Sequence, residues 1–387
     1  MHSNMLDNIY NYIKKGGITF IILCFTLIMN HSFGYITLLG VFIVVFFFSY
    51  TIKKGTINNK EFILLFSLGC YIIISSINGY KCSVYEILLN LLTPFFFFQY
   101  GGFVVKKWQT ENELIIFWIT IIVCYCLDAY LVGIENIIST GQIAGSLDER
   151  NLSVESQGVT YVVSATQLGL CLDIAVVGLS MSIIAKEKTQ KVSFLLMFIF
   201  ALVVTFNMLN RTAIIITFVC LFVVNGYRSR KNVFVFIISV LLVLASISLL
   251  FYTGIINDEL VELYTDRNED LSTAGNRTQR WDYAVEQLFM FPFGWGDGKT
   301  YYIHNMWLDI ARISGLIPFI ALAYFALNSF KESIKMIKIH ETSLMYLILG
   351  LNVCFFASCF VEPITGGTHF MLYCMLWGFQ NALSNKN

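Results

Sequence analysis

The sequence predicts an all-α, polytopic integral membrane protein. Of its 387 residues, 57% are hydrophobic and only 13% are charged, and the mean hydropathy is +0.70. A typical soluble domain has about 45–50% apolar and about 25% charged residues. This composition excludes a soluble enzyme or nucleic-acid binder, and it excludes a disordered chain, which requires low hydrophobicity. The net charge of +0 means that no global electrostatic field points to an acidic or basic partner.

Continuous apolar runs predict where the chain crosses the membrane. A helix needs about 20 apolar residues to cross, and continuous runs favour helices over the alternating pattern of a β-barrel. We treat 1–387 as one transmembrane domain with two long outer loops, at 135–159 and 256–303. The twelve expected spans are 17–31, 35–52, 61–78, 84–104, 114–134, 160–185, 192–209, 212–226, 233–255, 304–327, 342–361 and 367–384.

The basic residues support this topology. If the N-terminus is cytoplasmic, 17 of the 25 basic residues fall in inner segments, and every inner loop holds at least two. This distribution satisfies the positive-inside rule and favours an even number of spans with both termini cytoplasmic. The inner residues are Lys14, Lys15, Lys53, Lys54, Lys60, Lys106, Lys107, Lys186, Lys188, Lys191, Arg228, Arg230, Lys231, Lys331, Lys335, Lys338 and Lys386.

Arginines on the predicted outer face are unusual and need a reason. Arg211 lies in a tight outer turn between two spans, where its guanidinium either meets anionic phosphates or anchors a helix end. Arg277 and Arg280 lie in loop 256–303. Three guanidiniums at one place would suit a diphosphate, because the planar fork pairs bidentately with phosphate oxygens. The alternative is a set of surface ion pairs.

Loop 256–303 also contains a predicted amphipathic helix. It begins after a serine or threonine N-cap at 272–273 and ends before Pro292. Arg277 lies on the apolar side of the helix and Arg280 on its flank, so we expect a helix lying on the membrane surface. Its apolar stripe consists of Trp281, Ala284, Val285 and Leu288.

A glycine cluster and a histidine follow this helix. Glycines at 294–298 let the backbone approach a ligand closely, and Trp295, Tyr301 and Tyr302 offer flat faces for sugar rings. His304 lies where the loop re-enters the membrane, and an imidazole there is either a structural residue or a general base for a hydroxyl.

Ionisable residues inside predicted spans are functional candidates by default. Asp128 and Asp173 are two of them, with no role assigned. Asp309 and Arg312 are three residues apart, and we expect them to satisfy each other. Nine of the ten cysteines lie in apolar runs, with only Cys82 in a loop, so we expect no disulfide framework and no zinc site.

These residues together resemble one known family, the O-antigen polymerase/ligase superfamily. The resemblance extends over the whole topology, and its specific part is residues 210–212 and 277–315. The matching motifs are Asn210-Arg211-Thr212, Asn276-Arg277-Thr278-Gln279-Arg280-Trp281, Pro292-Phe293-Gly294-Trp295-Gly296, and His304-Asn305 with Gly315 ten residues after Asn305.

The resemblance implies an inverting, GT-C-like glycosyltransferase of the bacterial inner membrane that uses no metal or other cofactor. Its donor and acceptor would be undecaprenyl-diphosphate-linked glycans in the periplasm, joined into long-chain O-antigen for lipopolysaccharide biosynthesis. Arg211 and an arginine of the pair Arg277 and Arg280 would bind the diphosphate, and His304 would activate the acceptor hydroxyl. Membrane lipids and a chain-length regulator protein are the other implied partners.

Within the family, a polymerase is favoured over a ligase that transfers glycan to lipid A core. Where the ligase pattern places a small or β-branched residue, three after the glycine, this chain has Pro318. The spaced Arg-to-Gly motif of some polymerase loops is also absent. The choice of a polymerase therefore follows from the overall apolar and aromatic character of the chain. A lipid-linked oligosaccharide flippase is the rival of another class. Transporters tend to have repeated halves and polar midplanes, whereas the polar residues here concentrate in one outer loop.

Overall fold

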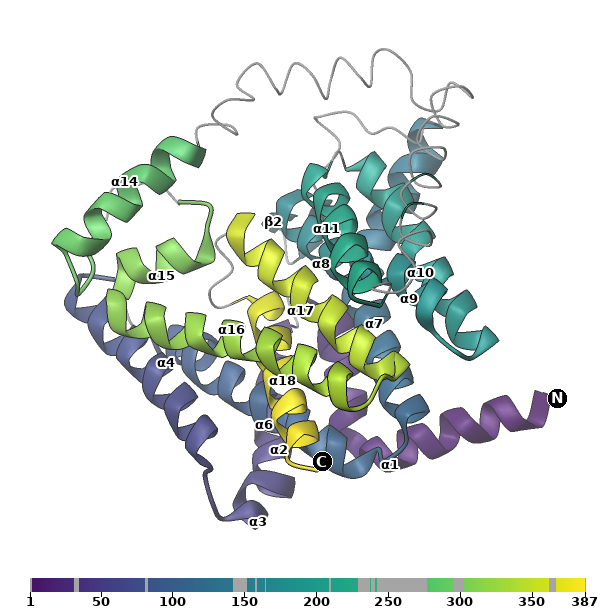
Figure 1. Ribbon diagram of the computed structural model, residues 1–387. Helices are drawn as coiled ribbons and strands as arrows, with labels where there is room; N and C mark the ends of the chain where they lie inside the picture. The colour runs from purple at the N-terminus through teal and green to yellow at the C-terminus, as the bar shows by residue number, and fades with distance from the viewer. Residues whose placement is uncertain are drawn as a thin grey trace. The chain divides into compact units, whose positions relative to one another are not determined.

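The computed structural model divides the chain into two compact units. Figure 1 labels helices and strands of both units. The structure describes residues 2–30, 35–80, 83–141, 152–156, 159–163, 165–208, 210–228, 237, 241, 277–295, 303–361 and 367–386, with the backbone alone at 2–14, 152–156, 159–163 and 165–166. The first unit comprises Met1–Tyr125, Trp281–Ile348 and Cys359–Asn387, and the second comprises Cys126–Arg280 and Leu349–Ser358. Each unit is described by itself.

The first unit contains helices from both ends of the chain. Three of its helices, α7, α14 and α17, continue into the second unit. Its elements are α1 (His2–Ile28), α2 (Tyr35–Phe46), the π-helical turn η1 (Phe47–Thr51), α3 (Ile52–Lys54), α4 (Asn59–Ile77), α5 (Val84–Ile87), the π-helical turn η2 (Leu88–Leu92), α6 (Thr93–Lys107), α7 (Glu111–Thr140), α14 (Arg277–Met290), α15 (Met306–Ser314), α16 (Leu316–Ile339), α17 (Ser343–Val361) and α18 (Thr368–Ser384).

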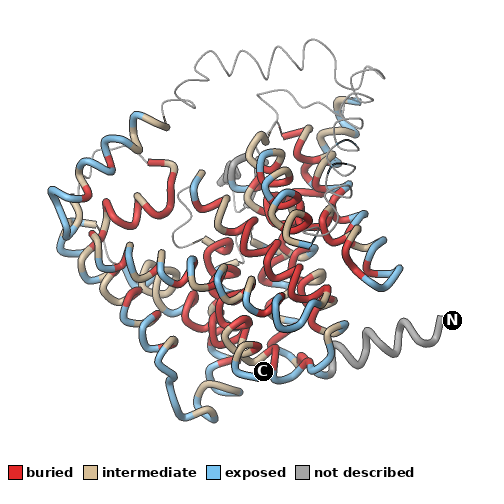
Figure 2. The backbone as a smooth tube through the Cα atoms, viewed as in Figure 1, coloured by how far each residue is buried: buried red, intermediate tan, exposed pale blue. Residues whose placement is uncertain are grey.

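The core of the first unit lies where α6 packs against α18. At Gly101, an added Cβ would overlap the backbone of Met375, and at Gly378 it would overlap the backbone of Phe98. The two helices therefore approach backbone to backbone, as small residues allow between helices in membranes. Nearly all of α18 is buried (Figure 2).

Local sequence explains how α4 begins. Asn58 is the N-cap: its side chain accepts a hydrogen bond from the backbone N–H of Glu61, and Glu61 accepts one from the backbone N–H of Asn58. This reciprocal capping box satisfies two of the free donors at a helix start. Lys54, in the last turn of α3, forms an ion pair with the buried Glu61. The predicted inner loop 53–60 is thus tied to α4.

The second unit contains a two-stranded hairpin and a group of helices. Its elements, besides its share of α7, α14 and α17, are β1 (Leu152–Ser156), β2 (Val159–Val163), α8 (Ala165–Ala175), α9 (Val177–Ile184), α10 (Lys188–Asn207) and α11 (Arg211–Arg228). The hydroxyl of Tyr130 on α7 donates to the Met197 carbonyl on α10 (3.2 Å), and the Cys126 thiol of α7 donates to the Cys171 carbonyl on α8 (3.1 Å).

The structure confirms a chain of apolar helices. Among the described residues, eight helices are long and apolar enough to cross a membrane, by length and composition. Helices also lie at the other predicted spans, except 233–255, nearly all of which falls outside the described residues. The protein is therefore polytopic, while the count of twelve spans stays a prediction.

Two predicted boundaries are wrong. Strands β1 and β2 pair antiparallel, with Leu152 opposite Val163, so the predicted span 160–185 begins as a strand and becomes helical only at Ala165. Runs of β-branched residues favour strands, and 159–163 holds four of them (three Val and one Thr). The predicted span 304–327 is also broken, because α15 ends at Ser314 and α16 begins after Gly315.

Candidate functional site

His304 lies directly before the N-terminus of α15. Its φ of 53° is the single positive value at a non-glycine residue in the described part of the chain. Asn305 is the N-cap of α15, and its Oδ1 accepts from the backbone N–H groups of Trp307 (3.0 Å) and Leu308 (3.2 Å). Ile303 and Asn305 are both buried, whereas His304 is half-exposed. The His304 backbone is thus held by buried neighbours on each side, while its side chain is partly exposed, with Nδ1 buried.

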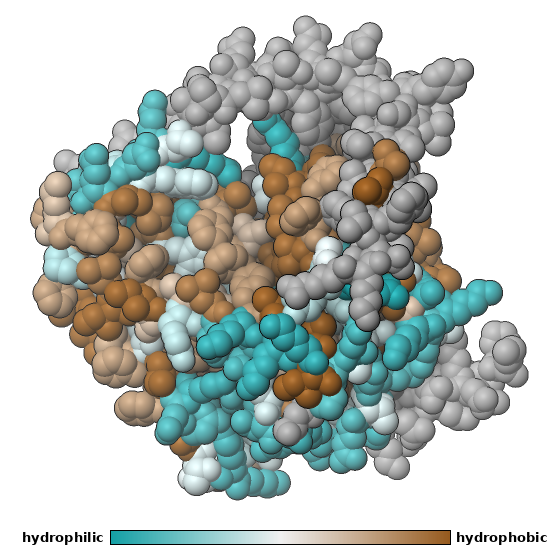
Figure 3. All heavy atoms as spheres, in the orientation of Figure 1, coloured by the Kyte–Doolittle hydropathy of each residue, from teal (hydrophilic) through white to brown (hydrophobic). Residues whose placement is uncertain are grey.

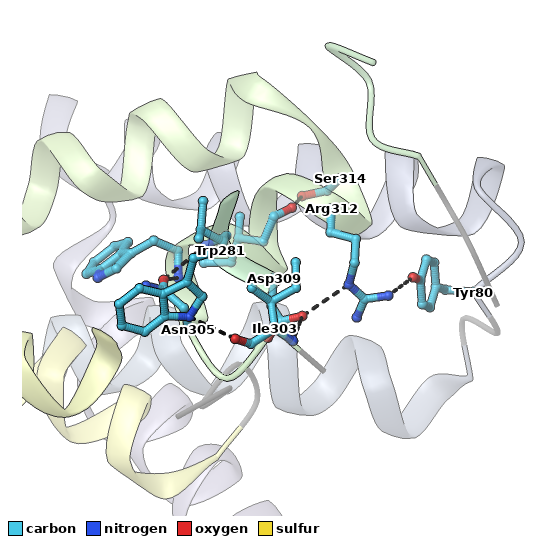
Figure 4. A network of polar contacts seen from close by, with 10 residues as sticks. Tyr80, Trp281, Ile303, Asn305, Asp309, Arg312 and Ser314 are labelled. Carbon is cyan, nitrogen blue, oxygen red and sulfur yellow. Dashed lines mark hydrogen bonds and ion pairs between the residues drawn. The ribbon is translucent and has the colours of Figure 1, made fainter. Parts of the chain in front are cut away.

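Helix α14 is hydrogen-bonded to the residue that precedes His304. Nε1 of Trp281 donates to the carbonyl of Ile303 over 2.9 Å, as Figure 4 shows. Ala284 and Leu288 of the same helix are buried. The predicted helix is therefore confirmed, from Arg277 to Met290, and part of its predicted stripe packs on protein rather than on lipid. Val285 is an exception, because it is exposed.

The two candidate arginines of this helix occupy its first turn. Arg277 begins α14, Arg280 directly precedes Trp281, and both are half-buried. The hydrogen bond from Trp281, the residue after Arg280, reaches the carbonyl of Ile303, the residue before His304. The predicted N-cap at 272–273 lies outside the described residues.

A buried ion pair organises α15, and it confirms the predicted pairing of Asp309 with Arg312. Nε of Arg312 donates to Oδ1 of Asp309 over 3.1 Å, and both side chains are almost fully buried. The same oxygen accepts a longer bond from the backbone N–H of Ile303 (3.4 Å). Another guanidinium nitrogen of Arg312 donates to the hydroxyl of Tyr80 over 2.6 Å (Figure 4). The pair thus connects the end of α4 with the segment before His304.

Helix α15 has nine residues and spans about 14 Å, less than the about 30 Å of a bilayer core. The Asp309 carboxylate is thus held by Arg312 within a helix that is too short to cross the bilayer by itself.

The turn after α14 crosses the break between α15 and α16. Gly294 (φ 88°) and Gly315 (φ 77°) have positive φ, and a Cβ on Gly315 would overlap the Pro292 carbonyl. The N–H of Trp295 donates to the Arg312 carbonyl (3.1 Å), and the N–H of Leu316 donates to the Pro292 carbonyl (2.8 Å). Gly294 was expected to admit a ligand, but the groups that approach it are the Asn78 side-chain amide and the backbone of Arg312 and Gly315.

Asn78 forms hydrogen bonds to both segments that cross here. Its Nδ2 donates to the carbonyls of Phe293 (2.7 Å) and Ile313 (3.0 Å). Neither Asn78 nor Tyr80 was predicted as part of the site. The dipeptide Asn78-Gly79 signals only a turn after a span, and no local pattern reveals which distant carbonyls the amide meets.

Arg211 lies in the second unit, at the first position of α11. Oδ1 of Asn210 accepts from the N–H groups of Thr212 (3.0 Å) and Ala213 (3.4 Å), which fixes the start of the helix. The tight connection predicted here is confirmed, because α10 ends at Asn207 and α11 begins at Arg211. The Arg211 side chain is half-buried.

The remaining candidates divide by burial. Asp173 of α8 is buried and Asp128 of α7 is half-buried. Trp295 is half-buried, whereas Tyr301 and Tyr302 lie outside the described residues. Within the described ranges, no group of three or more His, Cys, Asp or Glu side chains is placed to hold a metal ion.

Comparison with known proteins gives no relative: no protein-family model matches the chain, and no curated protein matches its sequence.

Proposed function

We propose that this protein is a membrane-embedded glycosyltransferase that polymerises undecaprenyl-diphosphate-linked oligosaccharide repeat units into long-chain O-antigen or a related surface polysaccharide. One observation carries the proposal: the indole of Trp281, which follows Arg280 in the chain, is hydrogen-bonded to the carbonyl of Ile303, which precedes His304. Cationic groups for a diphosphate and a base for a hydroxyl are the two chemical parts that such a transfer needs.

In this proposal Arg277 and Arg280 bind the diphosphate of the donor lipid. The charge on that diphosphate grows as the glycosidic bond breaks, so fixed guanidiniums stabilise the transition state more than the ground state. A positioned donor of this kind contributes about 3–4 kcal/mol. Arg211 is assigned the same diphosphate-binding role only because Asn210-Arg211-Thr212 resembles the motif of the family.

His304 acts as the general base in the same proposal. Neutral imidazole takes the proton from a hydroxyl of the acceptor sugar, and that oxygen attacks the anomeric carbon of the donor glycan. The bond between the anomeric carbon and the diphosphate oxygen breaks on the opposite face, so the configuration inverts and undecaprenyl diphosphate leaves. Proton transfer of this kind contributes about 10²–10⁴-fold to the rate.

The same proposal places the protein in a bacterial inner membrane, with twelve GT-C-like spans, both termini in the cytoplasm and the site in the periplasm. The distribution of lysines and arginines supports this orientation. Membrane lipids surround the chain, and a chain-length regulator protein is the partner expected to set the polymer length.

Purified protein in vesicles, given a lipid-linked repeat unit, tests the proposal by producing a ladder of polymer. Arg277→Ala, Arg280→Ala and His304→Ala should each reduce the ladder to single repeats. Arg228→Ala and His340→Ala are matched controls, because Arg228 lies at the far end of α11 and His340 caps the end of α16. They should polymerise normally.

A full ladder from the His304 variant would remove the base assignment, and a full ladder from both arginine variants would remove the diphosphate site. Transfer only to lipid A core would assign a ligase instead. Movement of the lipid-linked unit across the vesicle membrane without new glycosidic bonds would assign a flippase.

A further inference from the structure

The end of α14 and the turn after it expose a second apolar surface. Its most exposed side chains are Phe289 (76%), Met290 (67%) and Phe293 (64%). We call residues 289–293 the apolar apex. On the same helix, Ala284 and Leu288 are buried in the protein. The apex is therefore a surface in addition to the face by which α14 docks.

The apolar apex lies at the junction of two helices. Nδ2 of Asn78, directly after α4, donates to the Phe293 carbonyl over 2.7 Å. The N–H of Leu316, the first residue of α16, donates to the Pro292 carbonyl over 2.8 Å. The end of α4 and the start of α16 therefore both contact the apex, and these contacts fix its height relative to both helices.

Both helices present exposed apolar stripes at helical spacing. Helix α4 is one of the helices long and apolar enough to cross a membrane, so exposed apolar residues along it face lipid. The two stripes end at Ile77 and Ile317, next to the apex. The stripe on α4 is Phe62, Phe66, Ile73 and Ile77, and that on α16 is Ile317, Ile320, Tyr324 and Leu327.

Figure 3 shows hydrophobic side chains gathered on the side of the first unit where α4, α16 and the end of α14 lie. The apolar apex thus continues the lipid-facing surface of α4 beyond the end of the helix. Two acidic residues are also exposed on α14: Asp282 lies near its arginine-bearing end, and Glu286 lies one turn before the apex.

We propose that the apolar apex inserts into the lipid bilayer and anchors one end of α14 in the membrane. Aromatic residues are favoured at the membrane–water interface, and apolar side chains at the end of a surface helix bury in the acyl boundary. Anchored at its last turn and bonded through Trp281 near its first, α14 is fixed at both ends. The proposal depends on the membrane location alone, not on the proposed function.

Photocrosslinking of the full chain tests this insertion. The photoreactive residue p-benzoyl-phenylalanine replaces Phe289 or Phe293, one at a time, in protein reconstituted into vesicles of phosphatidylethanolamine and phosphatidylglycerol. Asp282, near the other end of the same helix, is the matched control position, and Phe66 of α4 is the lipid-facing reference. All four side chains are exposed, so their replacement leaves the buried core unaltered. After illumination, mass spectrometry measures the lipid adduct on each peptide.

The expected result is lipid adduct at Phe289 and Phe293 close to that at Phe66 and severalfold above that at Asp282. Adduct at the two apex positions no greater than at Asp282 would overturn the proposal. So would crosslinks from the apex to a second copy of the chain in place of lipid. Polymerisation is not measured, so failure of the proposed glycosyltransferase function would leave this result unaffected.

Discussion

At His304 the backbone adopts a conformation that side chains rarely take. A non-glycine residue at positive φ costs about 1–3 kcal/mol and persists only where surrounding structure enforces it. Here the enforcement comes from Ile303 and Asn305, which are buried on either side and bonded to Trp281, Asp309 and the start of α15. Such strain is typical of functional positions.

Glycine and alanine at position 304 should separate the backbone's role from that of the imidazole. Glycine adopts positive φ without strain, so His304→Gly should be more stable than His304→Ala by about 1 kcal/mol. Both variants should lose polymerisation, because both lack the proposed base. Thermal unfolding in detergent measures the first effect, and the vesicle assay measures the second. Equal unfolding midpoints for the two variants would contradict the enforced conformation.

Among the helices, α14 is held near its start by the side-chain hydrogen bond of Trp281. Trp281→Phe keeps an aromatic ring but removes Nε1–H, leaving the buried Ile303 carbonyl without its donor. An unsatisfied buried group costs about 1–3 kcal/mol. We therefore expect faster hydrogen–deuterium exchange across 281–290 and weaker polymerisation, although Arg277 and Arg280 remain.

Trp118→Phe is the matched control for that substitution. Trp118 is fully buried, and its Nε1 has no hydrogen-bond partner among the described residues. Its replacement removes ring volume but no hydrogen bond, so exchange across 281–290 should stay at the level of the unaltered protein. Equal exchange in the two variants would show that the Trp281 bond does not hold α14.

The Asp309–Arg312 pair holds α15 in place, and it should be strongly coupled. Asp309→Ala leaves the buried Arg312 charge without its carboxylate, and loss of one partner of a buried pair costs about 3–5 kcal/mol. The double variant Asp309→Ala/Arg312→Ala should be less destabilised than the sum of the two single variants. Thermal unfolding of the four proteins measures this coupling, and strict additivity would contradict it.

For the molecule as a whole, the first unit depends on the close approach of α6 and α18. Polar side chains reinforce the packing of α18 against α16. Gln380 accepts a hydrogen bond from the Ser329 hydroxyl, and its Nε2 donates to the Ser333 hydroxyl over 2.6 Å. All three residues are buried. Hydrogen bonds between buried polar groups on neighbouring helices are worth about 0.6–2 kcal/mol in membranes.

Two adjacent glycines of α6 provide a test of the close contact between α6 and α18. An added Cβ at Gly101 would overlap the Met375 backbone, whereas at Gly102 it would make an ordinary contact, at 3.8 Å, with the Gly378 carbonyl. Gly101→Ala should therefore destabilise the protein by at least about 1–3 kcal/mol, and Gly102→Ala should change its stability little. Thermal unfolding in detergent distinguishes them, and similar losses would mean that α6 and α18 are not in backbone contact.

The sequence by itself determined the membrane class, because hydropathy acts locally: any segment with enough apolar residues leaves water, whatever its neighbours. For the same reason it predicted the helix ending before Pro292 and the pairing of Asp309 with Arg312, which lie one helical turn apart. The hydrophobic period and the residue spacing are enough to predict structure where the interacting residues are close in the chain. The hairpin at 152–163 was missed because an apolar β-branched run reads equally well as the start of a span.

Only the tertiary structure decided what surrounds His304. The contacts of Trp281 with Ile303, of Tyr80 with Arg312 and of Asn78 with Phe293 join residues 22, 232 and 215 positions apart. The free energy of such contacts depends on how the whole chain packs, and no local pattern encodes the partner. The packing also decided which side of α14 meets protein, because a stripe of apolar residues is equally suited to lipid and to a protein core.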